Sequence, residues 1–170
     1  MIARAAPLDL YWLECALPEV PENFPAMRRL RTLAHAAGLR VAGCETMIGR
    51  AGFKPFFEAE LYDVVMPDVK YAGGLAEFLR IAALAHAFGV LCSAHNPSGP
   101  ICHAHSLQVS SLIQASPFLE HQFDESPLFG ELVIEPPADF TAPRVARLRR
   151  AGLGIILDLA ALARHADAAS

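Results

Sequence analysis

Five short apolar segments of this chain each end in one ionisable residue, and these residues recur at a nearly constant interval. They are Glu14, Glu45, Asp68, His95 and Glu120, separated by 31, 23, 27 and 25 residues. A βαβ unit, with its strands, helix and connecting loops, takes about 30 residues or more. The spacing therefore predicts repeated strand and helix units, with an ionisable residue at the carboxyl end of each strand.

The apolar pattern between these positions alternates between strand and helix. In the first expected helix Met27, Leu30 and Ala34 fall on one face. Regular alternation of this kind predicts a parallel sheet buried on both faces. We expect strands at 10–14, 40–44, 63–66, 90–94 and 118–120, helices at 24–37, 55–61, 74–88 and about 100–115, and a hairpin at 127–137.

Composition limits the classes of function. The chain has 170 residues and is 54% hydrophobic, enough for a single domain spanning 1–170. Its net charge is −4, and 14 basic residues are scattered among 18 acidic ones, which excludes a nucleic-acid partner. Asp158 interrupts the longest apolar stretch, and Pro7 and Asp9 interrupt the start, so we expect a cytoplasmic protein without a membrane partner. Four cysteines outside any CxxC pair are expected to be reduced.

Carboxyl ends of strands in a parallel barrel meet on one rim, where catalytic residues converge. Carboxylates are ligands that suit Mg²⁺, and an imidazole beside a carboxylate is an oriented general base. Such a set suits abstraction of a proton α to a carboxylate, because the resulting enediolate needs cations to hold its charge. A closed barrel takes about 250 residues, so we expect only part of one.

The segments YWLE, VAGCE, MPDVKYAGG, SAHNPSGP and FLE resemble successive strand ends of the enolase superfamily, in its mandelate racemase and muconate lactonizing enzyme branch. The resemblance runs from about Leu8 to the closing AGLGIILD. It implies an α/β fold that is a partial TIM (β/α) barrel, roughly strands four to eight. The capping domain and the first strands of the family would then be absent.

The resemblance also implies roles for the five residues. Glu14 and Glu45 match the Mg²⁺ ligands of the fourth and fifth strands. Asp68 and His95 match a dyad in which the histidine is the base and the aspartate orients it. Glu120 matches the acid that hydrogen-bonds the substrate carboxylate.

The loop ETMIGRAGF is similar to that of members that dehydrate acid sugars, which implies that Arg50 binds substrate. We therefore expect a small carboxylate substrate, with dehydration of a sugar acid ahead of racemisation or epimerisation. Two features depart from the family. The third metal ligand, which belongs to an earlier strand, is absent, and Cys15 stands where the family usually has Glu or Gln.

Two other interpretations remain open. The chain could be a catalytically inactive, truncated barrel fragment that self-associates as a homo-oligomer, because an open parallel sheet leaves two edges unpaired. It could also be a zinc-binding module built on Cys102, His103 and His105, although neighbours two positions apart on a helix point in different directions. Lys70 is expected to be a solvated loop charge, and three further histidines, at 35, 86 and 121, to serve the surface or packing.

Overall fold

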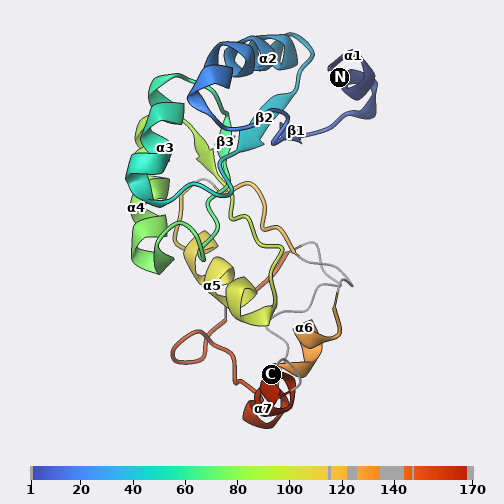
Figure 1. The fold of residues 1–170 in the computed structure, drawn as a ribbon, viewed down its shortest axis with the longest axis vertical. Helices are drawn as coiled ribbons and strands as arrows, with labels where there is room; N and C mark the ends of the chain where they lie inside the picture. Colours follow the sequence, from blue (N-terminus) through green and yellow to red (C-terminus); the bar gives the residue numbers. More distant parts are fainter. Residues whose placement is uncertain (1, 115, 122–125, 135–143, 147, 168–170) are drawn as a thin grey trace.

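The structure is a computed structural model and describes residues 2–114, 116–121, 126–134, 144–146 and 148–167. Strands and helices alternate through the first two thirds of the chain, as predicted. The two termini lie at opposite ends of the long axis (Figure 1). The elements are α1 (Ile2–Ala5), η1 (Ala6–Leu8), β1 (Trp12–Glu14), η2 (Pro21–Asn23), α2 (Phe24–Ala36), β2 (Arg40–Gly43), α3 (Gly49–Glu58), β3 (Val64–Val65), α4 (Gly74–Ala87), β4 (Leu91–Cys92), α5 (Pro100–Ser110), α6 (Leu128–Glu131) and α7 (Leu159–Asp167).

The four strands form one parallel sheet in the order β1-β2-β3-β4. Strands that follow one another along the chain are therefore neighbours in space. Leu13 pairs with Val41, and Val64 pairs with Ala42 on one side and Leu91 on the other. All four strands point the same way, so their carboxyl ends lie along one edge of the sheet. The predicted α/β fold with a parallel sheet is confirmed.

Side chains alternate strictly between the two faces of this sheet. Leu13, Val41, Val65 and Cys92 belong to the main core, together with buried side chains of α2, α3 and α4, which cover this face (Figure 1). On the opposite face lies a smaller cluster of Trp12, Ala42, Val64, Met66 and Leu91. Period-two alternation is the geometry of a strand. Apolar side chains on both faces explain why the strands read as continuous apolar runs.

The carboxyl-terminal third of the chain departs from the predicted elements. The strand expected at 118–120 is reduced to a single parallel bridge between Ala94 and Leu119. The hairpin expected at 127–137 is wrong: residues 128–131 form the short helix α6, which follows Pro127. Proline favours the start of a helix because its φ angle is already helical. Val133 then pairs antiparallel with Leu157, far along the chain, and residues 135–137 lie outside the described residues.

Helix boundaries also shift. The helix predicted at 55–61 begins at Gly49, and the one predicted to reach about 115 ends at Ser110, residue 115 itself being outside the described part.

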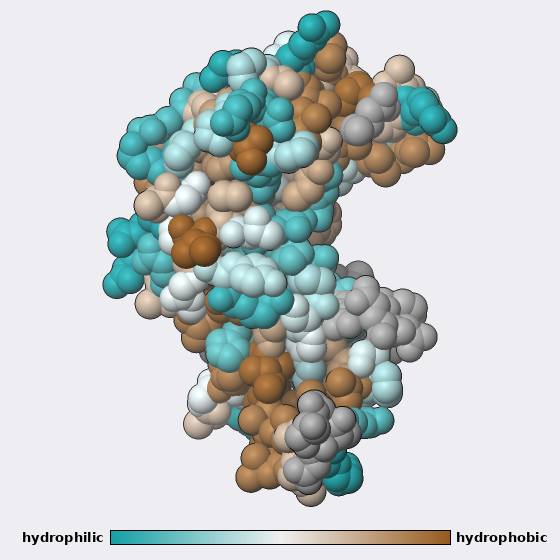
Figure 2. All heavy atoms as spheres, in the orientation of Figure 1, coloured by the Kyte–Doolittle hydropathy of each residue, from teal (hydrophilic) through white to brown (hydrophobic). Residues whose placement is uncertain are grey.

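Apolar side chains gather towards the end of the molecule that carries α7 (Figure 2). The exposed large apolar residues of the carboxyl-terminal third include Phe118, Leu128, Ile134, Ile156 and Leu159. Within the described ranges, no helix combines the length and apolar character needed to cross a bilayer. All four cysteines are free thiols, and only Cys15 is exposed.

Candidate active site

The five ionisable residues that punctuate the sequence meet at the carboxyl edge of the sheet. Glu14 is the last residue of β1, Glu45 follows β2 by two residues, and Asp68 and His95 follow β3 and β4 by three. Glu120 comes directly after the bridge at Leu119. Parallel pairing therefore carries each side chain to the same rim. The regular spacing of these residues along the sequence therefore corresponds to proximity at one edge of the sheet.

His95 stands between two carboxylates. Its Nδ1 is 2.9 Å from Asp68 Oδ2, and its Nε2 is 3.5 Å from Glu45 Oε2. The Asp68 side chain is 0% exposed, and the backbones of Asp68 and His95 form a parallel bridge. The aspartate thus fixes the ring, and Nε2 is the nitrogen turned towards the other rim carboxylates. An imidazole oriented in this way has one nitrogen available for proton transfer.

The electrostatics of the pair favour an ionised aspartate and a basic histidine. Burial alone would lower the pKa of His95, but the hydrogen bond to Asp68 and the charges of Glu45 and Glu120 raise it above its ordinary value. Burial would raise the pKa of Asp68, yet the bonds from His95 and Lys70 hold it below its ordinary value. Both shifts follow from opposite charges held close together.

Three carboxylates concentrate negative charge beside this pair. Burial raises the pKa of Glu14, a hydrogen bond from Trp12 partly offsets this, and neighbouring Glu45 and Glu120 raise it further. Trp12 Nε1 donates to Glu14 Oε2 at 2.8 Å, and Cys15 Sγ donates to Glu45 Oε1 at 3.2 Å.

Glu14 and Glu45 offer hard oxygen donors side by side, a donor set that fits a divalent cation such as Mg²⁺. They are a pair, however. Among the residues that the structure describes, no group of three or more His, Cys, Asp or Glu side chains is arranged to hold a metal ion.

Asn96 supports the rim in a way that the sequence analysis missed. Its backbone N–H donates to Glu120 Oε2 at 2.7 Å, and its Nδ2 donates to the Glu120 carbonyl at 2.8 Å. Nδ2 also lies 2.6 Å from His103 Nδ1. The residue is buried, and it directly follows His95. A polar residue next to His95, in the loop HNPSGP, was the available signal.

Lys70 makes contacts that the sequence did not reveal. Its Nζ lies 3.3 Å from Asp68 Oδ2 and bonds to Ser98 Oγ, while its backbone N–H donates to Asp68 Oδ1 at 2.8 Å. Its side chain is 37% exposed, as expected for a charge on a loop, but it also has definite partners. Lys70 ties the loops after β3 and β4 to the buried aspartate.

Arg50 is not among the rim contacts. Its Nε lies 2.8 Å from Glu77 Oε1, and its backbone N–H donates to the same oxygen at 3.1 Å. Arg50 lies in the first turn of α3 and Glu77 in the first turn of α4, so this pair links the starts of the two helices. The predicted role of Arg50 in substrate binding stays a prediction.

The predicted zinc site is wrong. His103 contacts Asn96, and His105 Nδ1 donates to the carbonyl of Ile101 at 2.8 Å. Cys102 Sγ is 4.0 Å from Asp68 Oδ1. His103 points away from Cys102 and His105, as expected for residues one and two positions apart on a helix, and the described part of the chain brings no group of three or more such side chains together.

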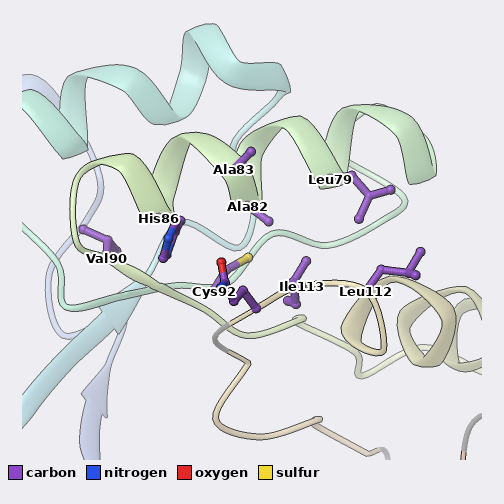
Figure 3. Close-up of a pocket in the computed structure, with 9 residues that line it drawn as sticks. Leu79, Ala82, Ala83, His86, Val90, Cys92, Leu112 and Ile113 are labelled. Atoms are coloured by element: carbon purple, nitrogen blue, oxygen red, sulfur yellow. The ribbon is translucent and has the colours of Figure 1, made fainter.

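An apolar pocket lies between α4, β4 and the segment that follows α5 (Figure 3). His86, Val90 and Cys92 contribute to it, together with apolar side chains of α4 and of the segment after α5. None of the five rim residues lines it. His86 thus serves packing near this pocket, whereas His35 has a definite partner, with Nε2 2.9 Å from both oxygens of Asp63.

Fold and rim together define a class of protein. The family model described as enolase C-terminal domain-like matches residues 1–161, so this chain belongs to that family. The resemblance inferred from the five segments is confirmed.

Individual relatives are acid-sugar enzymes. The chain is 29% identical over 162 residues to D-gluconate dehydratase of Thermoproteus tenax, covering 95% of this chain and 32% of that protein. It is 30% identical over 157 residues to D-xylonate dehydratase of Haloferax volcanii, covering 92% and 37%. The chain therefore spans about a third of the length of these relatives.

Solved structures share the fold. The 3,6-anhydro-D-galactonate cycloisomerase of Zobellia galactanivorans superimposes with a TM-score of 0.85 at 24% identity, over 96% of this chain and 44% of that one. An L-alanine-DL-glutamate epimerase-like protein of Burkholderia xenovorans, solved with magnesium and fumarate, gives 0.81 at 23% identity, over 96% and 39%.

Proposed function

We propose that this chain supplies strands four to eight of an enolase-type (β/α) barrel as one domain, and that it takes part in Mg²⁺-dependent dehydration of a sugar acid. His95 is the base that removes the proton α to the substrate carboxylate. The observation that supports this most is the position of its ring, 2.9 Å from buried Asp68 and 3.5 Å from Glu45. That arrangement gives an oriented base beside a pair of candidate metal ligands.

Each rim residue then has a defined task. Asp68 accepts a hydrogen bond from the Nδ1–H of His95 and holds the ring so that Nε2 faces the substrate. After Nε2 has taken the α-proton, the protonated His95 gives that proton to the departing β-hydroxyl, which leaves as water. Glu120, held by Asn96, hydrogen-bonds the substrate carboxylate. Glu14 and Glu45 would hold Mg²⁺, which when bound supplies positive charge to offset the charge that develops on the substrate carboxylate. The third protein ligand would come from outside these residues.

The substrate class follows from the relatives. Proteins named D-gluconate, D-xylonate and D-galactonate dehydratase are about 29–30% identical over most of this chain. A sugar acid is therefore the proposed substrate, with racemisation or epimerisation of a carboxylate as the second choice. Arg50 would reach such a substrate only by leaving Glu77. A cytoplasmic location is part of the same proposal.

The test measures exchange of the α-proton. The chain is incubated with Mg²⁺ and a panel of sugar acids in deuterated water, and loss of the α-proton signal is followed by proton NMR. Exchange is expected with the unchanged chain and is expected to disappear in His95→Asn. His86→Asn, in the pocket that none of the five rim residues lines, is the matched control and should exchange normally. Undiminished exchange in His95→Asn would show that another group is the base.

A second candidate is a non-catalytic, self-associating fragment. β1 and β4 are the outer strands of the four-stranded sheet, and exposed apolar side chains such as Ile134 and Leu159 lie at the α7 end. Unpaired strand edges and apolar surface favour association into a homo-oligomer. Light scattering at micromolar concentration separates the cases. A stable monomer that catalyses exchange excludes the fragment, and an oligomer without exchange supports it.

A further inference from the structure

A carboxylate outside the predicted set joins the two strand ends that carry Glu14 and Glu45. Glu19 lies in the loop after β1, five residues beyond Glu14. Its Oε1 accepts the backbone N–H of Cys44 at 2.5 Å and the hydroxyl of Tyr62 at 2.7 Å. Cys44 is the residue immediately before Glu45. One oxygen of Glu19 thus links the loop after β1, the end of β2 and the approach to β3, and we name this set of contacts the Glu19 bridge.

The backbone at Cys44 needs such a partner. Cys44 is 0% exposed and has a φ angle of +75°, in the left-handed region that side chains other than glycine seldom adopt. A residue held in this region persists only where its surroundings determine it. The hydrogen bond from its own N–H to Glu19 is a direct constraint on this conformation. Because Cys44 sets the direction in which the chain leaves β2, the same bond constrains Glu45.

Gly43 leaves space for this carboxylate. A Cβ atom at Gly43 would lie 2.4 Å from Glu19 Oε1 and 2.5 Å from the Tyr62 ring. Tyr62 is itself buried and stacks on Phe56, with ring centroids 6.0 Å apart. Burial raises the pKa of Tyr62, and the hydrogen bond to Glu19 raises it further, so the hydroxyl keeps its proton as a donor. The segment Gly43-Cys44-Glu45 thus leaves room for the side chain of Glu19, which comes from the loop after β1.

A second contact acts in the same direction. Cys15, the residue after Glu14, donates its backbone N–H to the carbonyl of Ala42 at 3.0 Å and its thiol to Glu45 Oε1 at 3.2 Å. The segments that carry Glu14 and Glu45 are therefore joined at both ends of the loop that begins at Glu14, by Cys15 near its start and by Glu19 further along.

We propose that Glu19, oriented by Tyr62, is a positioning residue that fixes the Glu45 carboxylate beside that of Glu14. It does not touch the substrate. Its part in metal binding rests on the proposed function, because that part requires Glu45 to be a ligand. Loss of a hydrogen-bonding partner that orients a ligand typically weakens metal binding about 10-fold to 100-fold.

Three variants test this residue. Glu19→Ala removes the acceptor, whereas Glu19→Gln keeps an oxygen that can accept from Cys44 and Tyr62. Glu22→Ala is the matched control, since Glu22 is an exposed carboxylate in the same loop. The first measurement is hydrogen exchange of the Cys44 amide in the metal-free chain, by NMR. We expect this amide to exchange at least about 10-fold faster in Glu19→Ala, and at the unchanged rate in the other two variants.

The second measurement is Mn²⁺ binding by electron paramagnetic resonance, with Mn²⁺ as the probe for the Mg²⁺ site. Glu19→Ala should bind Mn²⁺ about 10-fold more weakly, with recovery in Glu19→Gln. Val109→Ala, a buried site on α5, provides a destabilised control that should keep its Mn²⁺ affinity. General destabilisation would weaken binding in both proteins, whereas positioning weakens it in Glu19→Ala alone.

The two measurements, exchange of the Cys44 amide and binding of Mn²⁺, distinguish a failure of this inference from a failure of the proposed function. If the unchanged chain binds no Mn²⁺, the metal assignment of Glu45 is overturned, and the exchange of Cys44 decides the Glu19 bridge by itself. If Cys44 exchanges equally in Glu19→Ala and the unchanged chain, the Glu19 bridge is refuted. Normal Mn²⁺ affinity in Glu19→Ala, with faster exchange, would overturn its role in positioning Glu45.

Discussion

Low pH should destabilise the protein through His103. Its contact Asn96 also donates to Glu120. His103 is 0% exposed, and its ring lies against those of His121 and Phe129, at centroid distances of 5.1 and 5.8 Å. Burial, and to a lesser extent the charge of His121, lowers the pKa of His103 to about 4. An unfolded histidine has a pKa near 6.5.

The sign and size of the effect follow from these two values. Between pH 6.5 and 4 the unfolded chain takes up a proton at His103 that the folded chain refuses, so the free energy of unfolding falls as the pH falls. For folded and unfolded values of about 4 and 6.5, the loss between pH 6 and pH 5 is about 1 kcal/mol. Below pH 4 both states are protonated, and the loss stops increasing.

Urea unfolding at pH 6.0, 5.5 and 5.0 measures this loss. His103→Gln cannot take up the proton, so the unchanged protein should lose about 1 kcal/mol more than the variant between pH 6 and pH 5. His121 titrates in both proteins, and its contribution largely cancels in the comparison. Equal pH dependence in the two proteins, or an NMR titration of His103 near 6.5, would refute the buried placement of this ring.

Three further substitutions test the packing. Gly43→Ala should lower the free energy of unfolding by about 1–3 kcal/mol, because its Cβ would lie 2.4 Å from Glu19 Oε1. Urea unfolding measures this loss, and an unchanged midpoint would contradict the close approach. Phe53→Ala should lower the free energy of unfolding by about 3–5 kcal/mol in the same assay, because Phe53 is 0% exposed in the main core. A loss below about 1 kcal/mol would place Phe53 outside the core. Arg50→Ala should cost less than about 1 kcal/mol, because the arginine of its pair with Glu77 is more than half exposed; a larger loss would give this pair a structural role.

The convergence of Glu14, Glu45, Asp68 and His95 was predictable because it depends on a period. When every strand is parallel and every unit has a similar length, the residues that end the strands must reach one edge. The strand faces were predictable for a similar reason, since Val64 and Val65 have to point to opposite sides. Neither inference required the positions of individual side chains.

What the sequence could not reveal depends on contacts between distant residues. The sequence pattern does not single out Glu19, because its contacts are with Cys44 and Tyr62, which lie 25 and 43 residues away. Lys70 looked like a solvated charge until Asp68 and Ser98 were placed around it.

The prediction of a hairpin at 127–137 failed for a related reason. Local alternation suggested a turn at Gly130, but Pro127 starts a helix there and Val133 pairs with Leu157 instead. In each of these cases tertiary contacts overrode the local pattern.

Strands that follow one another in the chain are also neighbours in the sheet, and this order affects how the protein folds and changes. Contacts between successive units are local in sequence, which favours rapid assembly of each pair. Each unit also contributes a single chemical group to the rim: Glu14, Glu45, Asp68 or His95. A substitution at one strand end therefore changes one group directly, and it affects a neighbouring group only where the two are in contact, as Asp68 and His95 are. Such a rim can acquire new chemistry one strand at a time.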